Sequence, residues 1–179
     1  IIKELVKRNK LRFEGVSINS KKIKKDNLFV AVKGKNHDGH IFVEEALKKK
    51  ASYCVVQKNI NKFNKKKLIK CSNTIHFLNK LATLKRKHTK SKVIAITGSS
   101  GKTTLKTLLG KTLNEYNKTY FSQKSYNNHI GVPLSLCNLE NNHKYGVFEI
   151  GMSRAGEIQK LSSLVKPDIA IITNIGEAH

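Results

Sequence analysis

The stretch Val93–Thr104, VIAITGSSGKTT, constrains the fold of this chain more than any other part of it. An apolar run ending at Thr97 is typical of a buried strand, and the small residues Gly98–Gly101 are typical of a tight turn. An amphipathic helix is predicted to begin at Lys102. A strand, a glycine-rich turn and a helix N-terminus in this order form an anion site, because backbone N–H groups and the helix dipole converge there. We therefore predict a nucleotide-binding loop at the end of a strand.

The residues of this loop have predicted roles in binding ATP and Mg²⁺. The Lys102 ammonium would reach the β- and γ-phosphates, and the Thr103 hydroxyl would ligate Mg²⁺. Ile96 stands where the general pattern G-x-x-x-x-G-K-[ST] has its first glycine, so the loop is a shortened variant. The predicted nucleotide-binding residues are Gly98, Ser99, Ser100, Gly101, Lys102, Thr103 and Thr104.

The chain beyond the loop predicts an α/β fold of the P-loop type. Leucines at helical spacing predict a helix that packs on a sheet, and these are Leu105, Leu108, Leu109 and Leu113. The strands expected at 145–150 and 169–172 are apolar without alternation. Such strands, alternating with helices, indicate a parallel sheet that is covered by helices on both faces.

The residues before the loop predict a second, smaller α/β domain. Compact apolar runs at 28–32 and 52–57 are typical of strands. Between them, 41–51 has helical spacing and places Phe42, Ala46 and Leu47 on one side of the expected helix. A short strand, a helix and a further strand in this order are consistent with a small α/β unit.

The charged segment Lys85–Lys92 lies directly before the strand of the phosphate loop and is the predicted domain boundary. We predict a small N-terminal α/β domain over 1–88 and the first part of a nucleotide-binding domain over 89–179. The sequence begins at Ile1 rather than Met and stops at His179 within an expected loop, so we expect a fragment at both ends.

Two further segments are expected at the same edge of the sheet as the phosphate loop. Glu149 lies near the end of one strand, and Thr173–His179 follows the next. Because ligands of parallel sheets bind at the carboxyl ends of the strands, these parts are predicted to form one site. Glu149 is a predicted Mg²⁺ ligand or a contact to its water, with helix capping and ion pairing as alternatives. His179 by itself is more typical of a surface histidine. His129, Asn127 and Asn128 could bind substrate or hold a turn through local hydrogen bonds.

The composition is strongly basic, with 35 Lys and Arg against 12 Asp and Glu and a formal net charge of +23. Such a charge is compatible with a nucleic-acid partner or an anionic membrane surface. Nearly all the basic residues are lysines, however, whereas arginine is favoured for phosphate and base contacts. We therefore favour a compositional origin of the charge and predict no nucleic-acid partner. A nucleic-acid-binding P-loop ATPase remains the alternative from another functional class.

The cysteines and the hydropathy pattern indicate a cytoplasmic protein. Cys54, Cys71 and Cys137 lack the spacing of a zinc site or a disulfide framework. The sequence has no apolar segment of the length that a membrane span requires, and it shows no signal peptide.

Five stretches, in this order, resemble the Mur ligase family: INSKKIKKDNLFVAVKGKNHDGHIFVEEAL, ITGSSGKTT, SYNNHIGVPLSL, EIGMSRAGEIQKL and PDIAIITNIGEAH. The resemblance implies an ATP-dependent amide ligase of peptidoglycan precursor synthesis that acts through an acyl phosphate. Gly151–Ile158 is similar to the branch that joins D-alanyl-D-alanine to UDP-N-acetylmuramoyl-tripeptide. The branch that adds the third residue, a diamino acid or lysine, to UDP-N-acetylmuramoyl-dipeptide is the alternative within the family.

The resemblance also implies roles for individual residues. Asn19–Lys21 stands where the family usually has Asp-Ser-Arg, so Ser20 and Lys21 are predicted to hold the UDP part of the substrate. Asn128 corresponds to a loop residue near the phosphates and the substrate. The implied catalytic residues are Lys102, Glu149 and His179, and the implied metal ligands are Thr103, Glu149 and His179. The family's carbamylated lysine and its C-terminal domain lie beyond these residues, so we expect residues 1–179 alone to be inactive, and we expect the enzyme to be a monomer.

Overall fold

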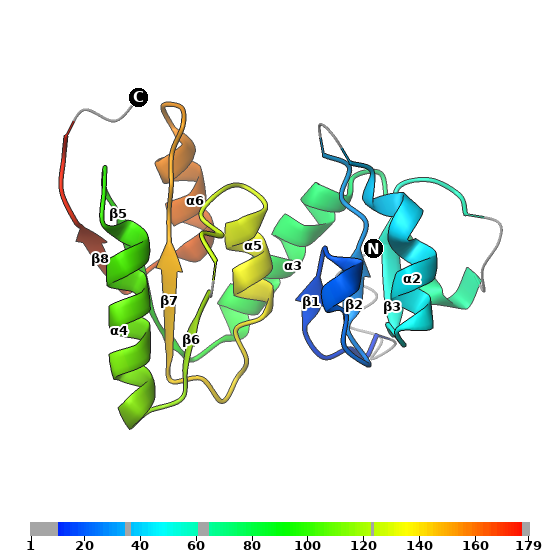
Figure 1. Cartoon of the computed structure of the whole chain (residues 1–179), viewed down its shortest axis with the longest axis horizontal. Coiled ribbons are helices and arrows are strands. Elements are labelled where there is room, and N and C mark those ends of the chain that lie inside the picture. Colours follow the sequence, from blue (N-terminus) through cyan, green and yellow to red (C-terminus); the bar gives the residue numbers. More distant parts are fainter. Residues whose placement is uncertain (1–10, 35–36, 61–64, 123, 177–179) are drawn as a thin grey trace. The chain divides into compact units, whose positions relative to one another are not determined.

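The computed structural model describes residues 11–34, 37–60, 65–122 and 124–176, and Figure 1 shows their arrangement. The chain divides into two compact units between Leu81 and Ala82. Each unit contains a parallel four-stranded sheet. The α/β class predicted from the sequence is therefore confirmed in both halves of the chain.

The first unit is built on the sheet β1-β2-β3-β4, whose strands are short and follow each other in chain order. The strands are β1 (Val16–Ser17), β2 (Leu28–Val30), β3 (Tyr53–Val56) and β4 (Leu68–Lys70). The connections contain the 3₁₀ turns η1 (Ser20–Lys22), η2 (Gly39–Phe42) and η3 (Lys65–Lys67), and the helices α2 (Val43–Lys48) and α3 (Thr74–His88). The buried residues of β2 and β3, such as Phe29 and Cys54, pack against Val43 and Ala46 of α2 and form the core.

The position of Phe42 differs from the prediction. Residues up to Phe42 form the 3₁₀ turn η2, and α2 begins only at Val43. A 3₁₀ turn has three residues per turn rather than 3.6, so it changes which side chains face the sheet. Val43 and Ala46 are buried in the core, whereas Phe42 and Ile41 are exposed.

The second unit begins in the last turns of α3 and contains the sheet β6-β7-β5-β8, in which all neighbours are parallel. Its strands are β5 (Lys92–Thr97), β6 (Thr119–Phe121), β7 (Tyr145–Glu149) and β8 (Ile169–Ile172). Its helices are α4 (Lys102–Tyr116), α5 (Gly131–Cys137) and α6 (Glu157–Val165). The central strand β5 leads directly into the phosphate loop, as predicted.

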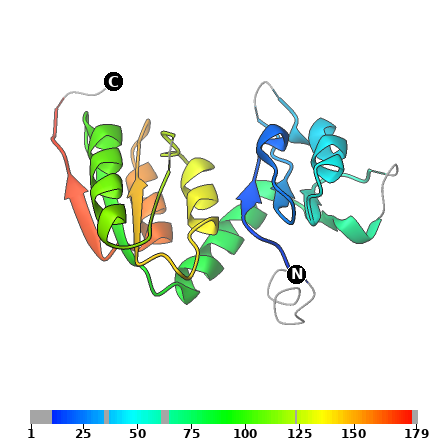
Figure 2. The same cartoon turned by 60° about the horizontal axis from the view of Figure 1, so that its bottom comes forward.

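Helices cover both faces of this second sheet, as Figure 2 shows for α4 on one side and α6 on the other. Leu105, Leu109 and Leu113 of α4 pack against a core that includes Ile96 and Val147. On the opposite face, Leu161 and Val165 are the buried residues of α6. The packing of α4 and α6 on the two faces therefore fixes the sheet, including the strands β5 and β7 that lead into the phosphate loop and to Glu149.

Two predictions about this packing are wrong. Leu108 is 63% exposed rather than buried, and the residues of α4 that are buried are Lys106 and Gly110. The reason is that Gly110 packs against the Phe121 ring, where an added Cβ would lie 2.4 Å from Cγ, so this side of the helix faces β6. The second wrong prediction is that helices cover the strand at 169–172 on both faces. This strand, β8, lies at the edge of the described sheet, and its Ile169 and Ile172 are exposed.

None of the helices in the described ranges has the length and apolar character that crossing a membrane requires.

Candidate functional site

The phosphate loop adopts a backbone that depends on two glycines. Gly98 has φ of +133° and Gly101 has φ of +75°, values that residues with a side chain rarely adopt. A Cβ at Gly98 would also lie 2.1 Å from Thr173 Oγ1. Gly101 is the N-cap of α4, and no side chain of the described residues caps the helix there. The first N–H groups of α4 are therefore available to an anion.

The loop is held by the segment that follows β8. The Ser99 N–H donates to the Asn174 carbonyl at 3.2 Å, and the Ser100 N–H donates to Asn174 Oδ1 at 2.9 Å. Thr173 Oγ1 donates to the Ser100 carbonyl at 2.6 Å. These bonds use the two serine N–H groups that were predicted to cradle phosphate, so the roles of Ser99 and Ser100 stay predictions. The proximity of Thr173–Gly176 to the loop agrees with the expectation that both lie at one edge.

Lys102 lies over this loop. Its Nζ donates to the carbonyls of Gly98 at 2.6 Å and Ser99 at 3.0 Å. Both acceptors are neutral backbone groups, and the structure shows no carboxylate bound to this ammonium within the described residues. A positive charge beside uncapped helix N–H groups makes this a suitable place for phosphate oxygens.

Thr103 and Glu149, which are 46 residues apart in the sequence, are brought together at the start of α4. The Thr103 hydroxyl donates to Glu149 Oε2 at 2.8 Å. Parallel pairing of β5 and β7 puts Glu149 beside Ile96, directly before the phosphate loop. Glu149 is only 2% exposed. The predicted meeting of these two residues therefore occurs in the structure.

Two residues contact Glu149 in ways that the sequence did not indicate: Asn127, which was considered only for substrate binding or a turn, and Lys106, which was missed as a site residue. Asn127 Nδ2 donates to Glu149 Oε1 at 2.8 Å. Lys106, which is 0% exposed, has its Nζ 3.6 Å from Glu149 Oε2. The i, i+3 spacing of Thr103 and Lys106 places both on the same side of a helix, and that spacing was the available signal for Lys106.

The oxygen atoms at this position suit Mg²⁺. Thr103 Oγ1 lies next to Glu149 Oε2, and Ser125 Oγ lies 3.3 Å from Thr103 Oγ1. Mg²⁺ prefers hard oxygen ligands and is usually bound by one or two carboxylates together with substrate phosphates and water. Across the described ranges, no cluster of three or more His, Cys, Asp or Glu side chains could hold a metal by itself. His179, the further predicted ligand, lies outside the described residues.

Asn128 makes contacts with the start of α5 through its side chain and its backbone, since its carbonyl accepts from the Val132 N–H at 3.0 Å. Its Oδ1 accepts from the N–H groups of Ile130 at 3.1 Å and Gly131 at 2.9 Å, so it stabilises the start of α5. Its neighbour Asn127 provides the bond to Glu149. The substrate contact that was predicted for Asn128 stays a prediction.

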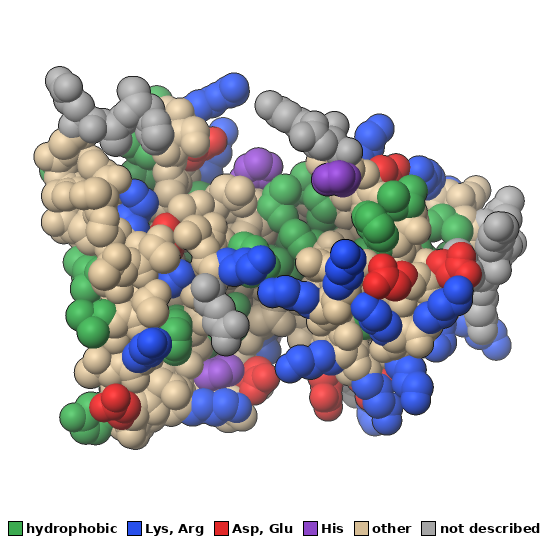
Figure 3. All heavy atoms as spheres, viewed as in Figure 1, with side chains coloured by type: hydrophobic (Ala, Val, Ile, Leu, Met, Phe, Trp, Pro, Cys, Tyr) green, Lys and Arg blue, Asp and Glu red, His purple; other side chains and the backbone are tan. Residues whose placement is uncertain are grey.

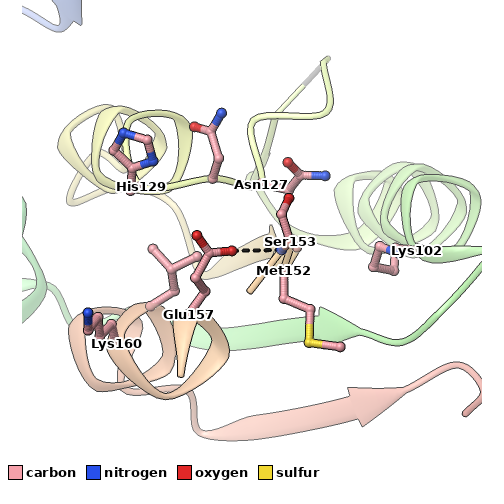
Figure 4. Close-up of a pocket in the computed structure, with 10 residues that line it drawn as sticks. Lys102, Asn127, His129, Met152, Ser153, Glu157 and Lys160 are labelled. Atoms are coloured by element: carbon pink, nitrogen blue, oxygen red, sulfur yellow. Dashed lines mark hydrogen bonds between the residues drawn. The ribbon is translucent and has the colours of Figure 1, made fainter. Parts of the chain in front are cut away.

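A cavity of about 620 Å³ opens beside Lys102, between the loop that contains Asn127 and the start of α6. Figure 4 shows His129, Glu157 and Lys160 around it. Glu157 Oε2 accepts from the Ser153 N–H at 2.7 Å and the Arg154 N–H at 3.2 Å. The Ser153 hydrogen bond, more than any other contact, lowers the pKa of Glu157 below its ordinary value. The lining of the cavity thus contains two ammonium groups, those of Lys102 and Lys160, and one carboxylate, that of Glu157. The excess of positive charge favours an anionic occupant.

In the first unit, Ser20 and Lys21 lie in η1, just after β1. Ser20 is buried and its Oγ donates to Glu45 Oε2 at 2.6 Å, while Lys49 Nζ donates to Glu45 Oε1 at 2.9 Å. The Ser20 hydrogen bond, followed by that of Lys49, lowers the pKa of Glu45. Lys21 is exposed. The structure thus places both residues at the carboxyl edge of their own sheet, the edge that ligands of parallel sheets use.

A second polar cluster lies at the same edge of this sheet, in η2 and directly after β3. His40 is buried, its Nδ1 lies 2.5 Å from Asp38 Oδ1, and its Nε2 accepts from the Gln57 N–H at 2.9 Å. Lys58 Nζ donates to Asp38 Oδ2 at 2.8 Å. The Lys58 hydrogen bond contributes most to a pKa of Asp38 that is far below its ordinary value. The Nε2 acceptor implies that Nδ1 carries the proton and donates to Asp38.

Comparison with protein families gives two matches that follow each other along the chain. Residues 12–86 match the model described as Mur ligase family, catalytic domain, and residues 96–179 match the Mur ligase middle domain. The UDP-N-acetylmuramoyl-tripeptide–D-alanyl-D-alanine ligase of Rickettsia prowazekii is 39% identical over 171 residues, which are 96% of this chain and 38% of the relative. The corresponding ligase of Buchnera aphidicola subsp. Acyrthosiphon pisum is 43% identical over 92% of this chain and 36% of the relative. The chain thus spans less than two fifths of the length of these relatives.

The chain is also similar to solved structures of Mur ligases. The MurF ligase from Thermotoga maritima in complex with ADP has a TM-score of 0.77 and 33% identity, and the match covers 95% of this chain and 39% of that structure. MurF from Acinetobacter baumannii has a TM-score of 0.79 and 34% identity, with 92% and 36% covered. A UDP-N-acetylmuramoyl-L-alanyl-D-glutamate–2,6-diaminopimelate ligase is only 17% identical, at a TM-score of 0.52, and shares the fold.

Proposed function

The chain belongs to the Mur ligase family, and we propose that it supplies the substrate-binding and ATP-binding parts of an ATP-dependent amide ligase. The proposed enzyme joins D-alanyl-D-alanine to UDP-N-acetylmuramoyl-tripeptide in peptidoglycan precursor synthesis. The observation that carries this proposal is the Thr103–Glu149 hydrogen bond at the end of the phosphate loop, in a chain similar to ligases named for that reaction. The uncapped start of α4 and the position of Lys102 support ATP as the nucleotide.

The predicted site residues of the second unit have proposed tasks in this reaction. ATP and Mg²⁺ would supply an activated γ-phosphoryl group: its transfer to the substrate carboxylate would release ADP and give an acyl phosphate, from which the amine would displace phosphate and lose a proton. Lys102 and the first N–H groups of α4 stabilise the charge on the transferring phosphoryl group. Thr103 and Glu149 hold Mg²⁺, with His179 as the proposed ligand of a second ion. The cavity beside Lys102 accepts the carboxylate end of the peptide substrate.

The first unit has a separate proposed task, which is to hold the UDP part of the substrate. Ser20 and Lys21 lie at the carboxyl edge of the β1–β4 sheet, where a nucleotide would be expected. We assign residues 1–88 to this task and residues 89–179 to the ATP-binding domain. The three cysteines are free thiols, which supports the proposed cytoplasmic location. A monomer is proposed as the working form.

Two alternatives make different predictions. A ligase that adds the third residue would use UDP-N-acetylmuramoyl-dipeptide and a diamino acid or lysine instead. A nucleic-acid-binding ATPase would need a continuous basic surface. Figure 3 shows that the Lys and Arg side chains on the face drawn are scattered and interspersed with acidic and apolar ones in the first unit. On this face the distribution of charge favours the ligase.

The test is a ligation assay on the full-length protein. The protein is incubated with ATP, Mg²⁺, UDP-N-acetylmuramoyl-tripeptide and D-alanyl-D-alanine, and the product is identified by mass together with ADP release. Parallel reactions contain the dipeptide substrate with a diamino acid or lysine, or single-stranded DNA with ATP alone. Product in the first reaction only is the expected result. Product only from the dipeptide substrate, or hydrolysis that depends on DNA, would replace the proposal with the corresponding alternative.

The variant Lys102→Ala tests the site assignment in the same assay. Loss of a preorganised contact to the transferring group typically lowers the rate by about 10²–10³-fold, so ligation is expected to fall at least that far. The exposed Lys111→Ala on the same helix is the matched control and is expected to retain the wild-type rate. Near-normal turnover of Lys102→Ala would contradict the assignment.

A further inference from the structure

Lys106 is a buried charged residue of α4 to which the proposed mechanism assigns no task. It is 0% exposed, whereas lysine side chains are almost never fully buried unless they are paired. Its Nζ donates to the Lys124 carbonyl at 3.0 Å and lies 3.6 Å from Glu149 Oε2. A buried ammonium in contact with a buried carboxylate forms a neutral pair, which is how charged side chains are retained in a protein interior.

We propose that Lys106 is a positioning residue that holds Glu149 in the orientation that binds Mg²⁺ and balances its buried charge. The proposal rests on the proposed function in one respect, which is that Glu149 is a metal ligand. It adds a residue to the site that the phosphate-loop pattern does not contain, since Lys106 lies one turn of α4 beyond Lys102.

The contacts of Glu149 indicate why Lys106 is needed. Oε1 accepts from Asn127 Nδ2, and Oε2 accepts from the Thr103 hydroxyl. Both donors are neutral, so Lys106 is the charged partner of this carboxylate in the described part of the chain. A carboxylate that is 2% exposed has almost no water to stabilise its charge. The Lys106 ammonium therefore balances the negative charge of the Glu149 carboxylate when no metal ion is bound.

The same ammonium joins two separate elements of the site. Its bond to the Lys124 carbonyl attaches the loop after β6 to α4. This loop then places Ser125 Oγ 3.3 Å from Thr103 Oγ1 and Asn127 against Glu149. Residues that orient metal ligands typically affect metal affinity or activity by about 10–100-fold when they are replaced. Lys106 orients the carboxylate directly and also holds the loop whose asparagine contacts it.

The first experiment measures Mg²⁺-dependent ADP binding by the full-length protein, using wild type, Lys106→Met and Lys111→Met. Met has a similar length without the charge, and Lys111 is an exposed lysine on the same helix. We expect Lys106→Met to raise the Mg²⁺ concentration for half-maximal ADP binding by about 10-fold or more. ADP binding in EDTA, which depends on the loop and Lys102, should change far less than the Mg²⁺ dependence does. An unchanged Mg²⁺ dependence in Lys106→Met would overturn the proposal.

The second experiment tests the charge balance without any ligand, by thermal unfolding of Lys106→Met, Glu149→Gln and the double variant. The double variant contains no unbalanced buried charge, so we expect its Tm to lie above that of Lys106→Met. A double variant that is no more stable than Lys106→Met would overturn the charge balance, and this comparison holds even if Lys106→Met folds poorly. If wild type shows no Mg²⁺-dependent ADP binding, the proposed function fails, whereas the unfolding comparison still decides the pairing of Lys106 with Glu149.

Discussion

The side-chain amide of Asn127 donates to Oε1 of Glu149 at 2.8 Å, and the backbone N–H of Gly151 donates to the Asn127 carbonyl at 2.9 Å. One residue of the loop after β6 therefore contacts the end of β7 through both its side chain and its backbone. A Cβ at Gly151 would lie 2.9 Å from Asn127 Cγ, so the two segments approach closely. Asn127 thus connects the cavity beside Lys102 to the predicted metal ligand.

Replacing Asn127 by Ala removes the donor to a buried carboxylate oxygen. Leaving a buried acceptor without its partner typically costs about 1–3 kcal/mol, so the free energy of unfolding is expected to fall by that amount. The exposed Asn141→Ala is the matched control and is expected to change stability by less than about 0.5 kcal/mol. Urea unfolding followed by circular dichroism measures both. Equal stabilities of the two variants would show that the Asn127–Glu149 bond contributes nothing.

Gly98→Ala is expected to abolish nucleotide binding. The new Cβ would lie 2.1 Å from Thr173 Oγ1 and 2.9 Å from the Asn174 carbonyl, so the loop or the segment after β8 must move. Gly156→Ala provides the control, because Gly156 also has a positive φ but nothing lies within 4 Å of its Cβ position. The control should lose only about 1 kcal/mol of stability from backbone strain and should still bind nucleotide. Calorimetric titration with ADP separates the two, and normal binding by Gly98→Ala would contradict the close approach.

The parts of the site that were predicted from the sequence follow either from local sequence patterns or from the topology of a parallel sheet. The phosphate loop is local, because strand, glycines and helix follow each other within twelve residues. The meeting of Thr103 and Glu149 was predictable because the carboxyl ends of parallel strands share an edge. Neither inference requires knowledge of how individual side chains pack.

The parts that were not predicted depend on tertiary packing. A lysine in an amphipathic helix is expected at the surface, but the Gly110–Phe121 contact turns α4 so that Lys106 is buried and Leu108 is exposed. Asn127 and Asn128 are identical in type and adjacent, so the sequence could not show which of them contacts Glu149 and which caps α5. Residue type alone carries no information about such orientations.

The Asp38–Lys58 pair predicts a pH dependence of stability in the first unit. The hydrogen bond from Lys58 lowers the pKa of Asp38 in the folded state far below its unfolded value, so the unfolded chain binds a proton more readily. The stability contributed by Asp38 is therefore present above the unfolded pKa of about 3.9 and is lost as the pH falls below it. The difference in unfolding free energy between wild type and Asp38→Asn should be largest near neutral pH and should shrink below about pH 4.

Lys58→Met is the companion variant for this measurement. It keeps Asp38 but removes the main cause of the lowered pKa, so stability should depend less on pH between about 4 and 2 than in wild type. Identical pH profiles of wild type and Lys58→Met would contradict the role assigned to this pair.

The contacts of Arg86 at the end of α6 predict that lysine cannot replace this arginine without a loss of stability. Its Nε donates to the Val165 carbonyl at 2.7 Å, and one terminal nitrogen donates to the Lys166 carbonyl at 2.6 Å and to Asp168 Oδ2 at 3.2 Å. The planar guanidinium reaches these acceptors together, whereas an ammonium on a flexible chain cannot. Arg86→Lys is therefore expected to lower the free energy of unfolding of the second unit by about 1–3 kcal/mol. The neighbouring exposed Lys87→Met should change it by less than about 0.5 kcal/mol, and urea unfolding that gives Arg86→Lys the stability of this control would show that the charge alone suffices.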